Sequence, residues 1–378
     1  MFSVLLGIGL LVALFVGFNI GGSSTGVAFG PAVGSGTLSK LAAAGLMTVF
    51  AFAGGWTVGR NVIATMGGEI VPSNQFTLAA SVAVLFFVGI ALLISNLFGV
   101  PASTSMTAVG AIAGLGVATG TIDWAVMGRI VSWWLVAPII AFWVCAVLGR
   151  YLYPYLDAWF ALDDAEGAKA AVSRAVVVGI GCYMAFSAGA SNVANAVAPL
   201  VAGGTGPLSV DQGVLLAAVA IGLGAFTIAR RTLDTVGNDL TDLPLLAALL
   251  VEVVSASLIT FLSAIGVPAS LAVSATMSII GLGWGRATRT TRLSEVASAA
   301  VRGEDRPEVT VDAIAADADG GRRATDGDVP RIGEEEPGEI ATADLFDPRT
   351  TGRVIMLWIL TPSIAGIASY LLFQFLSP

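Results

Sequence analysis

Ten apolar stretches, each long enough or nearly long enough to cross a lipid bilayer, recur along the 378 residues of this chain. Only 12% of the residues are charged, against about a quarter in soluble domains. The sequence therefore predicts an all-α polytopic membrane protein, in which the first run is a retained span and not a cleaved signal. The ten runs are 4–20, 39–57, 78–98, 104–121, 128–148, 172–190, 210–226, 243–265, 271–285 and 354–374.

An internal repeat divides the chain into two related halves. The stretch WTVGRNVIATMGGEI at 56–70 returns as FTIARRTLDTVGNDL at 226–240, and GVPAST at 99–104 returns as GVPASL at 266–271. Blocks that return in the same order at nearly constant spacing indicate a duplicated half.

A third pair of blocks places polar residues inside apolar runs. GGSSTGVAFGP at 21–31 aligns with GASNVANAVAP at 189–199. A polar side chain at bilayer depth is costly unless it finds a partner or lines a cavity. These serines and asparagines therefore either join helices together or contact something that passes through the membrane.

The distribution of basic residues predicts how the chain crosses the membrane. Five apolar runs separate 21–31 from its repeat at 189–199, and an odd number of spans inverts the second half. When loops are assigned alternately to two sides, most lysines and arginines fall on one side, which identifies the cytoplasm. We therefore expect a multi-pass protein of the cell (plasma) membrane with both termini external.

Acidic residues are concentrated in one segment near the C-terminus. More than half of the 26 acidic residues lie in 292–347, which is rich in Asp, Glu, Gly and Pro and has little periodicity. The predicted organisation is a first transmembrane repeat (1–148), a cytoplasmic connector (149–171), a second transmembrane repeat (172–285), an acidic, largely disordered cytoplasmic loop (286–350) and a C-terminal transmembrane helix (351–378).

Inverted repeats with apolar segments broken by glycine and proline are typical of secondary transporters, which bind substrate near the bilayer midplane. The breaks here occur at matching places, 21–36 against 189–206 and Pro101 against Pro268. A helix that begins inside the membrane points the positive end of its dipole inward and favours an anion. The sequence therefore predicts an anion-binding cavity between the two halves.

At these positions the chain resembles the inorganic phosphate transporter (phosphate permease) family of cation-coupled symporters. The family's duplicated GANDVANA-like motif corresponds to GGSSTGVA at 21–28 and GASNVANA at 189–196. Its PVSTTH-like motif corresponds to PASTSM at 101–106 and PASLAV at 268–273. The resemblance covers essentially the whole chain except the acidic loop. It implies phosphate transport by sodium- or proton-coupled symport with alternating access.

The chain departs from the family where charge is concerned. The Asn-Asp pair of the first motif is Ser23–Ser24 here, and in the repeat it is Ser191–Asn192. Both motif aspartates and every histidine are replaced. A sodium ion prefers carboxylate and carbonyl oxygens, and protonated phosphate needs an acceptor for its own O–H, whereas sulfate needs only donors. Two alternatives therefore stay open: a sulfate or other oxyanion permease, and a non-transporting anion sensor.

Two sets of candidate site residues follow from the motifs and the remaining acids. The hydroxyls and amides expected to bind substrate are Ser23, Ser24, Ser103, Thr104, Ser105, Ser191, Asn192, Asn195 and Ser270. The candidates for holding a coupling ion are Asn19, Asn192, Asn195, Glu69, Asp239 and Glu252. For Glu69 and Asp239, an ion pair with Arg60 or Arg230 is the structural alternative.

Several functional classes are excluded or disfavoured. The chain contains no histidine, which rules out Ser–His catalysis and His-based metal sites, and we expect no enzyme activity. We expect no cofactor and no nucleic-acid partner. The expected partners are phosphate or a related oxyanion, a coupling Na⁺ or H⁺, and the lipid bilayer. Sodium is the one metal considered, and a homo-oligomer is one alternative for the assembly.

Overall fold

Every regular element in the described part of the chain is a helix, which confirms the all-α prediction. The computed structural model describes residues 4–97, 103–160, 167–202, 207–228, 244–290 and 348–376. The long helices are α1 (Val4–Gly34), α2 (Lys40–Thr57), α4 (Leu78–Leu97), α5 (Thr104–Ala118), α6 (Trp124–Val147), α8 (Ala168–Val201), α9 (Val210–Thr227), α11 (Leu245–Ala264), α12 (Leu271–Ala287) and α14 (Pro348–Leu376). The short ones are α3 (Gly59–Ala64), η1 (Thr65–Glu69), η2 (Ser73–Gln75), η3 (Leu148–Leu152), α7 (Tyr153–Phe160) and η5 (Thr288–Thr290).

Each of the ten predicted apolar runs overlaps one long helix, but fewer than ten of these helices are complete spans. Within the described residues, six helices are long and apolar enough to cross a membrane, or seven if α2 and the segment after it form one span bent by 60°. The apolar parts of α4 and α5 are shorter. The prediction of an inverted second half depends on the number of spans, so that orientation stays a prediction.

The helices that carry the GANDVANA-like motifs are continuous. We expected a break within 21–36 and within 189–206, but α1 runs without interruption to Gly34 and α8 to Val201. Pro31 and Pro199 lie inside these helices close to their C-terminal ends. The cause is packing, because both motifs are buried on neighbouring helices and their small residues permit close approach.

One proline of the second motif pair, Pro268, does coincide with a break, and Pro101 lies outside the described residues. Helix α11 ends at Ala264, residues 265–270 are not helical, and α12 begins at Leu271 with Ser270 as its N-cap. Helix α5 begins in the same way at Thr104, with Ser103 as its N-cap. The residue before a proline is disfavoured in helical conformation, and serine is a preferred N-cap. Two helices therefore start at equivalent positions of the two repeats.

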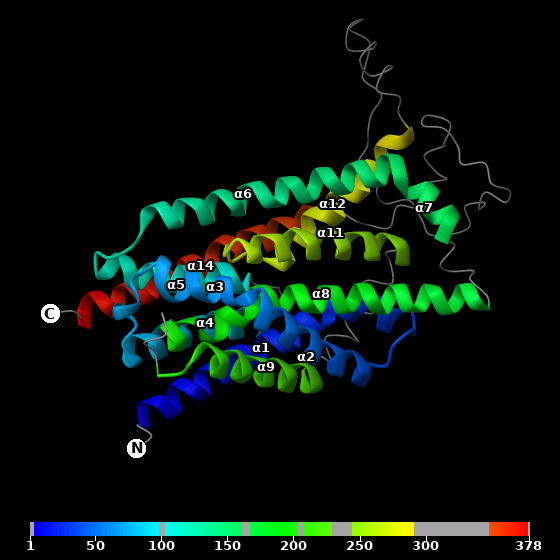
Figure 1. Cartoon of the computed structure of the whole chain (residues 1–378). Coiled ribbons are helices and arrows are strands. Elements are labelled where there is room, and N and C mark those ends of the chain that lie inside the picture. Colours follow the sequence, from blue (N-terminus) through cyan, green and yellow to red (C-terminus); the bar gives the residue numbers. More distant parts are fainter. Residues whose placement is uncertain are drawn as a thin grey trace, which may run out of the picture.

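The two halves are interleaved through their first two helices. Helix α1 packs on α9 and helix α2 packs on α8, so that each first helix of one half contacts the second helix of the other (Figure 1). Glycines permit this approach at equivalent positions. A Cβ added to Gly21 would lie 1.9 Å from the Ile221 carbonyl oxygen, and one added to Gly189 would lie 2.0 Å from the Ala51 carbonyl oxygen.

Replacing Gly189 with alanine is expected to destabilise the protein, because the added methyl group would collide with the backbone of α2. Overpacking of this kind costs about 1–3 kcal/mol. The matched control is Gly179→Ala on the same helix, where a Cβ meets no atom within 4 Å. We expect thermal unfolding in detergent to show a lower midpoint for Gly189→Ala only. Equal midpoints for both variants would contradict the close contact.

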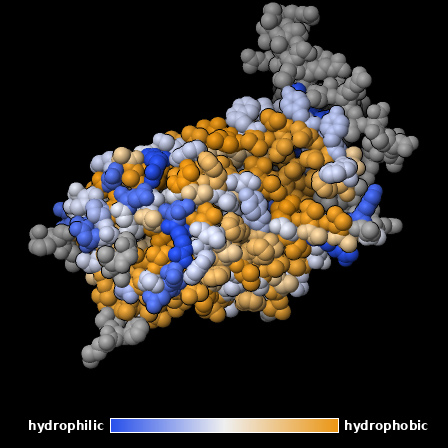
Figure 2. Space-filling model, viewed as in Figure 1, coloured by the Kyte–Doolittle hydropathy of each residue, from blue (hydrophilic) through white to orange (hydrophobic). Residues whose placement is uncertain are grey.

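The surface of the bundle is that of a membrane protein. Hydrophobic residues dominate the face seen in Figure 2, and hydrophilic residues gather toward the two ends of the bundle. Helix α1 begins and helix α14 ends at the same end of the molecule (Figure 1). The side of the membrane on which the termini lie stays a prediction.

Candidate functional site

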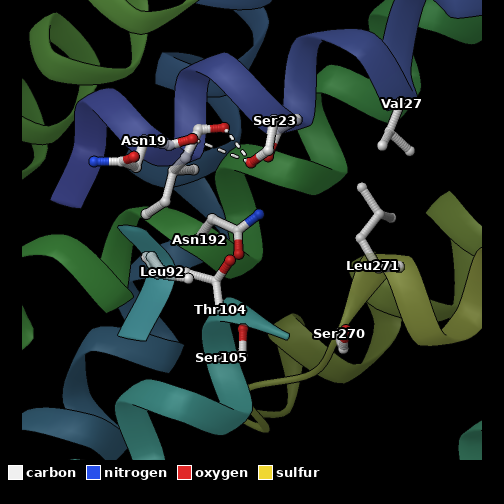
Figure 3. Close-up of a pocket in the computed structure, with 12 residues that line it drawn as sticks. Asn19, Ser23, Val27, Leu92, Thr104, Ser105, Asn192, Ser270 and Leu271 are labelled. Carbon is white, nitrogen blue, oxygen red and sulfur yellow. Dashed lines mark hydrogen bonds between the residues drawn. The ribbon is translucent and has the colours of Figure 1, made fainter. Parts of the chain in front are cut away.

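A cavity of about 80 Å³ lies where five helices from both repeats meet (Figure 3). Its volume is several times the space that one buried water molecule requires. The lining residues are Asn19, Ile20, Ser23, Ser24 and Val27 of α1, Leu92 of α4, Thr104 and Ser105 of α5, Asn192 of α8, and Ser270, Leu271 and Ala272 at the start of α12. None of these described lining residues carries a formal charge.

The N-termini of α5 and α12 both open onto this cavity. Ser103 Oγ accepts a hydrogen bond from the Met106 amide, and Ser270 Oγ accepts one from the Val273 amide, each over 3.3 Å. The first residues of each helix, Thr104 and Leu271 among them, line the cavity. The first-turn amides of a helix have no partner within the helix, and its dipole is positive at that end. The cavity is therefore electrically suited to an anion.

Asn192 is the lining side chain best placed to donate a hydrogen bond to a bound ion. Its Oδ1 atom accepts a hydrogen bond from Asn195 Nδ2 at 3.0 Å. Because this bond fixes the oxygen toward Asn195, the Nδ2 group of Asn192 is left to the cavity (Figure 3). An amide nitrogen carries two donor protons and no acceptor, which suits an oxyanion oxygen.

The polar groups of α1 face the cavity differently. Ser23 Oγ donates to the carbonyl oxygens of Asn19, at 3.1 Å, and Ile20, at 3.2 Å. Asn19 Nδ2 donates to the Phe15 carbonyl oxygen at 2.8 Å. Because the Ser23 hydroxyl proton points into its own helix, the lone pairs of Ser23 Oγ face the cavity. A hydroxyl oxygen in this orientation suits a cation or the O–H group of a protonated anion.

Three of the predicted substrate residues lie behind the cavity and not on its wall. Ser191 Oγ donates to the Ala269 carbonyl oxygen at 2.7 Å and lies 3.3 Å from Ser105 Oγ. Asn195 Nδ2 reaches Ser105 Oγ at 3.1 Å, and Ser103 caps α5. These contacts tie α8 to the start of α5 and to the residue before Ser270. They position the two helix N-termini.

One side of the cavity is apolar, and sequence reasoning missed it. Val27 and Leu271 face each other on this side, while Leu92 of α4 lies apart from them, beside Thr104 (Figure 3). In the repeat, Val27 corresponds to Asn195 and Leu271 to Thr104. The alignment of the two repeats was the signal that could have found these positions, because Thr104 was itself a candidate.

The acidic candidates do not line the cavity. Glu69 forms an ion pair with Arg129 at 2.9 Å, and both side chains are nearly half exposed. The structural alternative for Glu69, an ion pair, is present, but its partner is Arg129 and not Arg60, which binds Asp211 at 2.6 Å instead. Glu252 is buried on α11 and is not among the lining residues. The remaining acidic candidate and its expected arginine partner, Asp239 and Arg230, lie outside the described residues.

The chain is a polytopic helical membrane protein, and an uncharged cavity lies between its two repeats. Two helix N-termini point into this cavity, which is the architecture of a transporter. Residues 20–369 match the phosphate transporter family, and the chain belongs to this family. It is 34% identical over 275 residues to the sulfate permease CysP of Bacillus subtilis. The aligned region covers 72% of this chain and 76% of that relative. A solved structure titled the sodium-dependent phosphate transporter superposes with a TM-score of 0.68 at 18% identity and covers 99% of both chains.

Proposed function

We propose that this protein carries a tetrahedral oxyanion across the membrane by alternating access, with inorganic phosphate as the first candidate. The observation that carries the proposal is the meeting of two helix N-termini and the Asn192 amide in one cavity between the repeats. Membership of the phosphate transporter family supports phosphate. We further propose that transport is coupled to Na⁺ or H⁺ in the plasma membrane, with both termini outside.

Sulfate is the second candidate, and the uncharged lining favours it. Sulfate is fully ionised and needs only hydrogen-bond donors, which the helix N-termini and Asn192 supply. Monohydrogen phosphate also needs an acceptor for the hydrogen bond that its own O–H donates. Among the described lining residues, only neutral oxygens such as that of Ser23 can accept this bond. A relative named as a sulfate permease points in the same direction.

A competition assay in proteoliposomes is expected to separate these candidates. We expect labelled phosphate to accumulate, and excess sulfate to reduce its uptake because both ions would occupy the same cavity. A sulfate carrier would instead accumulate labelled sulfate, with phosphate as the weaker competitor. The same measurement with and without a sodium gradient tests the coupling ion. Binding without uptake of either anion would indicate a sensor, and neither binding nor uptake would refute the proposed function.

A further inference from the structure

Within the described residues, one acidic side chain is buried between helices with a carboxylate oxygen that has no hydrogen-bond partner. Glu252 of α11 is 4% exposed, and its Oε1 atom has no hydrogen-bond partner among the described residues. It is the only acidic residue that is buried in the described part of the chain. A lone carboxylate in a membrane interior is expensive to keep and marks a functional site by default. The cost is removed when the group binds a proton or a cation.

Helical geometry places Glu252 between α8 and α12. Its neighbours one turn along α11 are Ser255 and Ala256, which share its face. Ser255 Oγ lies 3.2 Å from Ser278 Oγ of α12, and the Ala256 carbonyl oxygen accepts a hydrogen bond from Ser187 Oγ of α8 at 3.1 Å. The same two helices, α8 and α12, contribute to the wall of the cavity.

Buried hydroxyls connect this region to the cavity. Ser270, Ser274 and Ser278 recur at every fourth position of α12, are all buried, and start at the cavity wall. On α8, Ser187 and Ser191 follow the same spacing, and Ser191 contacts Ser105 of the cavity. Residues four apart lie on one face of a helix, about 6 Å further along its axis. Two rows of hydroxyls therefore lead from the anion cavity toward Glu252.

The surroundings of Glu252 suit a proton better than a divalent metal ion. A divalent ion needs several oxygen ligands, and among the described residues no group of three or more Asp, Glu, Cys or His side chains could hold a metal ion, whereas a single carboxylate binds a proton without further ligands. None of the ionisable side chains on the packed helices bonds to Glu252 in the described structure. These side chains are Cys182, Tyr183, Lys169 and Arg174 on α8, Cys145 and Arg129 on α6, Arg286 on α12, and Arg60 on α3.

We propose that Glu252 is the proton-carrying residue of this transporter, which makes the coupling ion H⁺; this rests on the proposed oxyanion transport. Glu252 takes up a proton as the anion enters the cavity and releases the same proton when the anion leaves on the other side. An anion in the uncharged cavity and a carboxylate on a neighbouring helix repel each other, so each proton bound favours anion binding. One proton and one anion then cross together.

The Glu252→Gln variant tests this coupling, since the amide mimics the protonated carboxyl and cannot release a proton. Labelled phosphate and labelled sulfate are offered in parallel to proteoliposomes with an inward pH gradient. In the parent, a gradient of about one pH unit is expected to raise accumulation up to about tenfold for one proton per anion. In Glu252→Gln the gradient should change accumulation less than about twofold. Exchange of internal for external anion should continue.

The matched control is Asp211→Asn, which removes an exposed carboxylate paired with Arg60, outside every candidate set, and should keep the parent's response to the gradient. A gradient response in Glu252→Gln equal to that of the parent, or accumulation that follows a sodium gradient alone, would overturn the inference. No uptake of either anion by the parent would instead refute the proposed function. Should Glu252→Gln not fold, internal acidification during uptake by the parent decides. About one proton per sulfate, or more protons per phosphate than its own ionisation releases, is expected, and acidification below that would overturn the inference.

Discussion

The Asn192→Asp variant is expected to raise the ratio of phosphate to sulfate uptake by about tenfold to a hundredfold. The new carboxylate has the shape of the amide and keeps the acceptor that Asn195 Nδ2 contacts at 3.0 Å. Its second oxygen faces the cavity, where it accepts the O–H of protonated phosphate in a bond to a charged group, worth about 1.5–3 kcal/mol. Sulfate has no proton to give and is repelled by the added charge.

The same substitution should also make uptake respond to sodium, which the proton-coupled parent does not need, because it places a charged oxygen ligand next to the α1 oxygens. Kinetics of labelled phosphate and sulfate uptake at several sodium concentrations measure both effects. The control is Asn74→Asp, which makes the same change at an exposed position. Unchanged anion preference in Asn192→Asp would show that position 192 does not contact the transported ion.

The second large effect is expected from Asn192→Ala, which should weaken anion binding by about tenfold to a hundredfold through the loss of a donor to a charged oxygen. Folding should be little affected, since Asn195 Nδ2, which loses the Asn192 oxygen as an acceptor, keeps its bond to Ser105 Oγ at 3.1 Å. Ser191→Ala should behave differently. It removes the 2.7 Å bond to the Ala269 carbonyl oxygen, so we expect weaker binding together with a lower unfolding temperature.

Anion-dependent thermal shifts measure both quantities in one experiment. Asn192→Ala should keep the unfolding midpoint of the parent without anion and lose the anion-induced rise. Ser191→Ala should have a lower unfolding midpoint than the parent without anion, and added anion should raise that midpoint by less than in the parent. Identical behaviour of the two variants would contradict the division into a residue on the cavity wall and a residue that positions the wall.

The family and the helical architecture could be predicted because motif order and apolar length are properties of the sequence. The number of complete membrane spans could not be predicted. Whether the short apolar helices α4 and α5 cross the bilayer depends on the helices that pack against them. The continuity of α1 through 21–31 was also missed. Glycines and a proline normally predict a break, but here the glycines serve close helix contact.

The residue types of the candidate site could be predicted from the sequence. Which of these residues line the cavity and which lie behind it could not. Asn192 and Ser191 are adjacent in the sequence, yet one lines the cavity and the other lies behind it. Helices that are apolar on all sides give no periodic signal for the face that points inward. The partner of Glu69 could not be found either, because Arg129 is sixty positions away and outside the repeated block.

The interleaving of α1 with α9 and of α2 with α8 also constrains how the protein is made. Gly21 meets Ile221, a partner two hundred positions later in the chain. At a synthesis rate of about 5–20 residues per second, α1 waits roughly 10–40 seconds in the bilayer before its partner exists, and α2 waits a somewhat shorter time. During that interval their glycine faces are uncovered. We therefore expect the nascent first half to depend on lipid or on an insertion chaperone until the second half arrives.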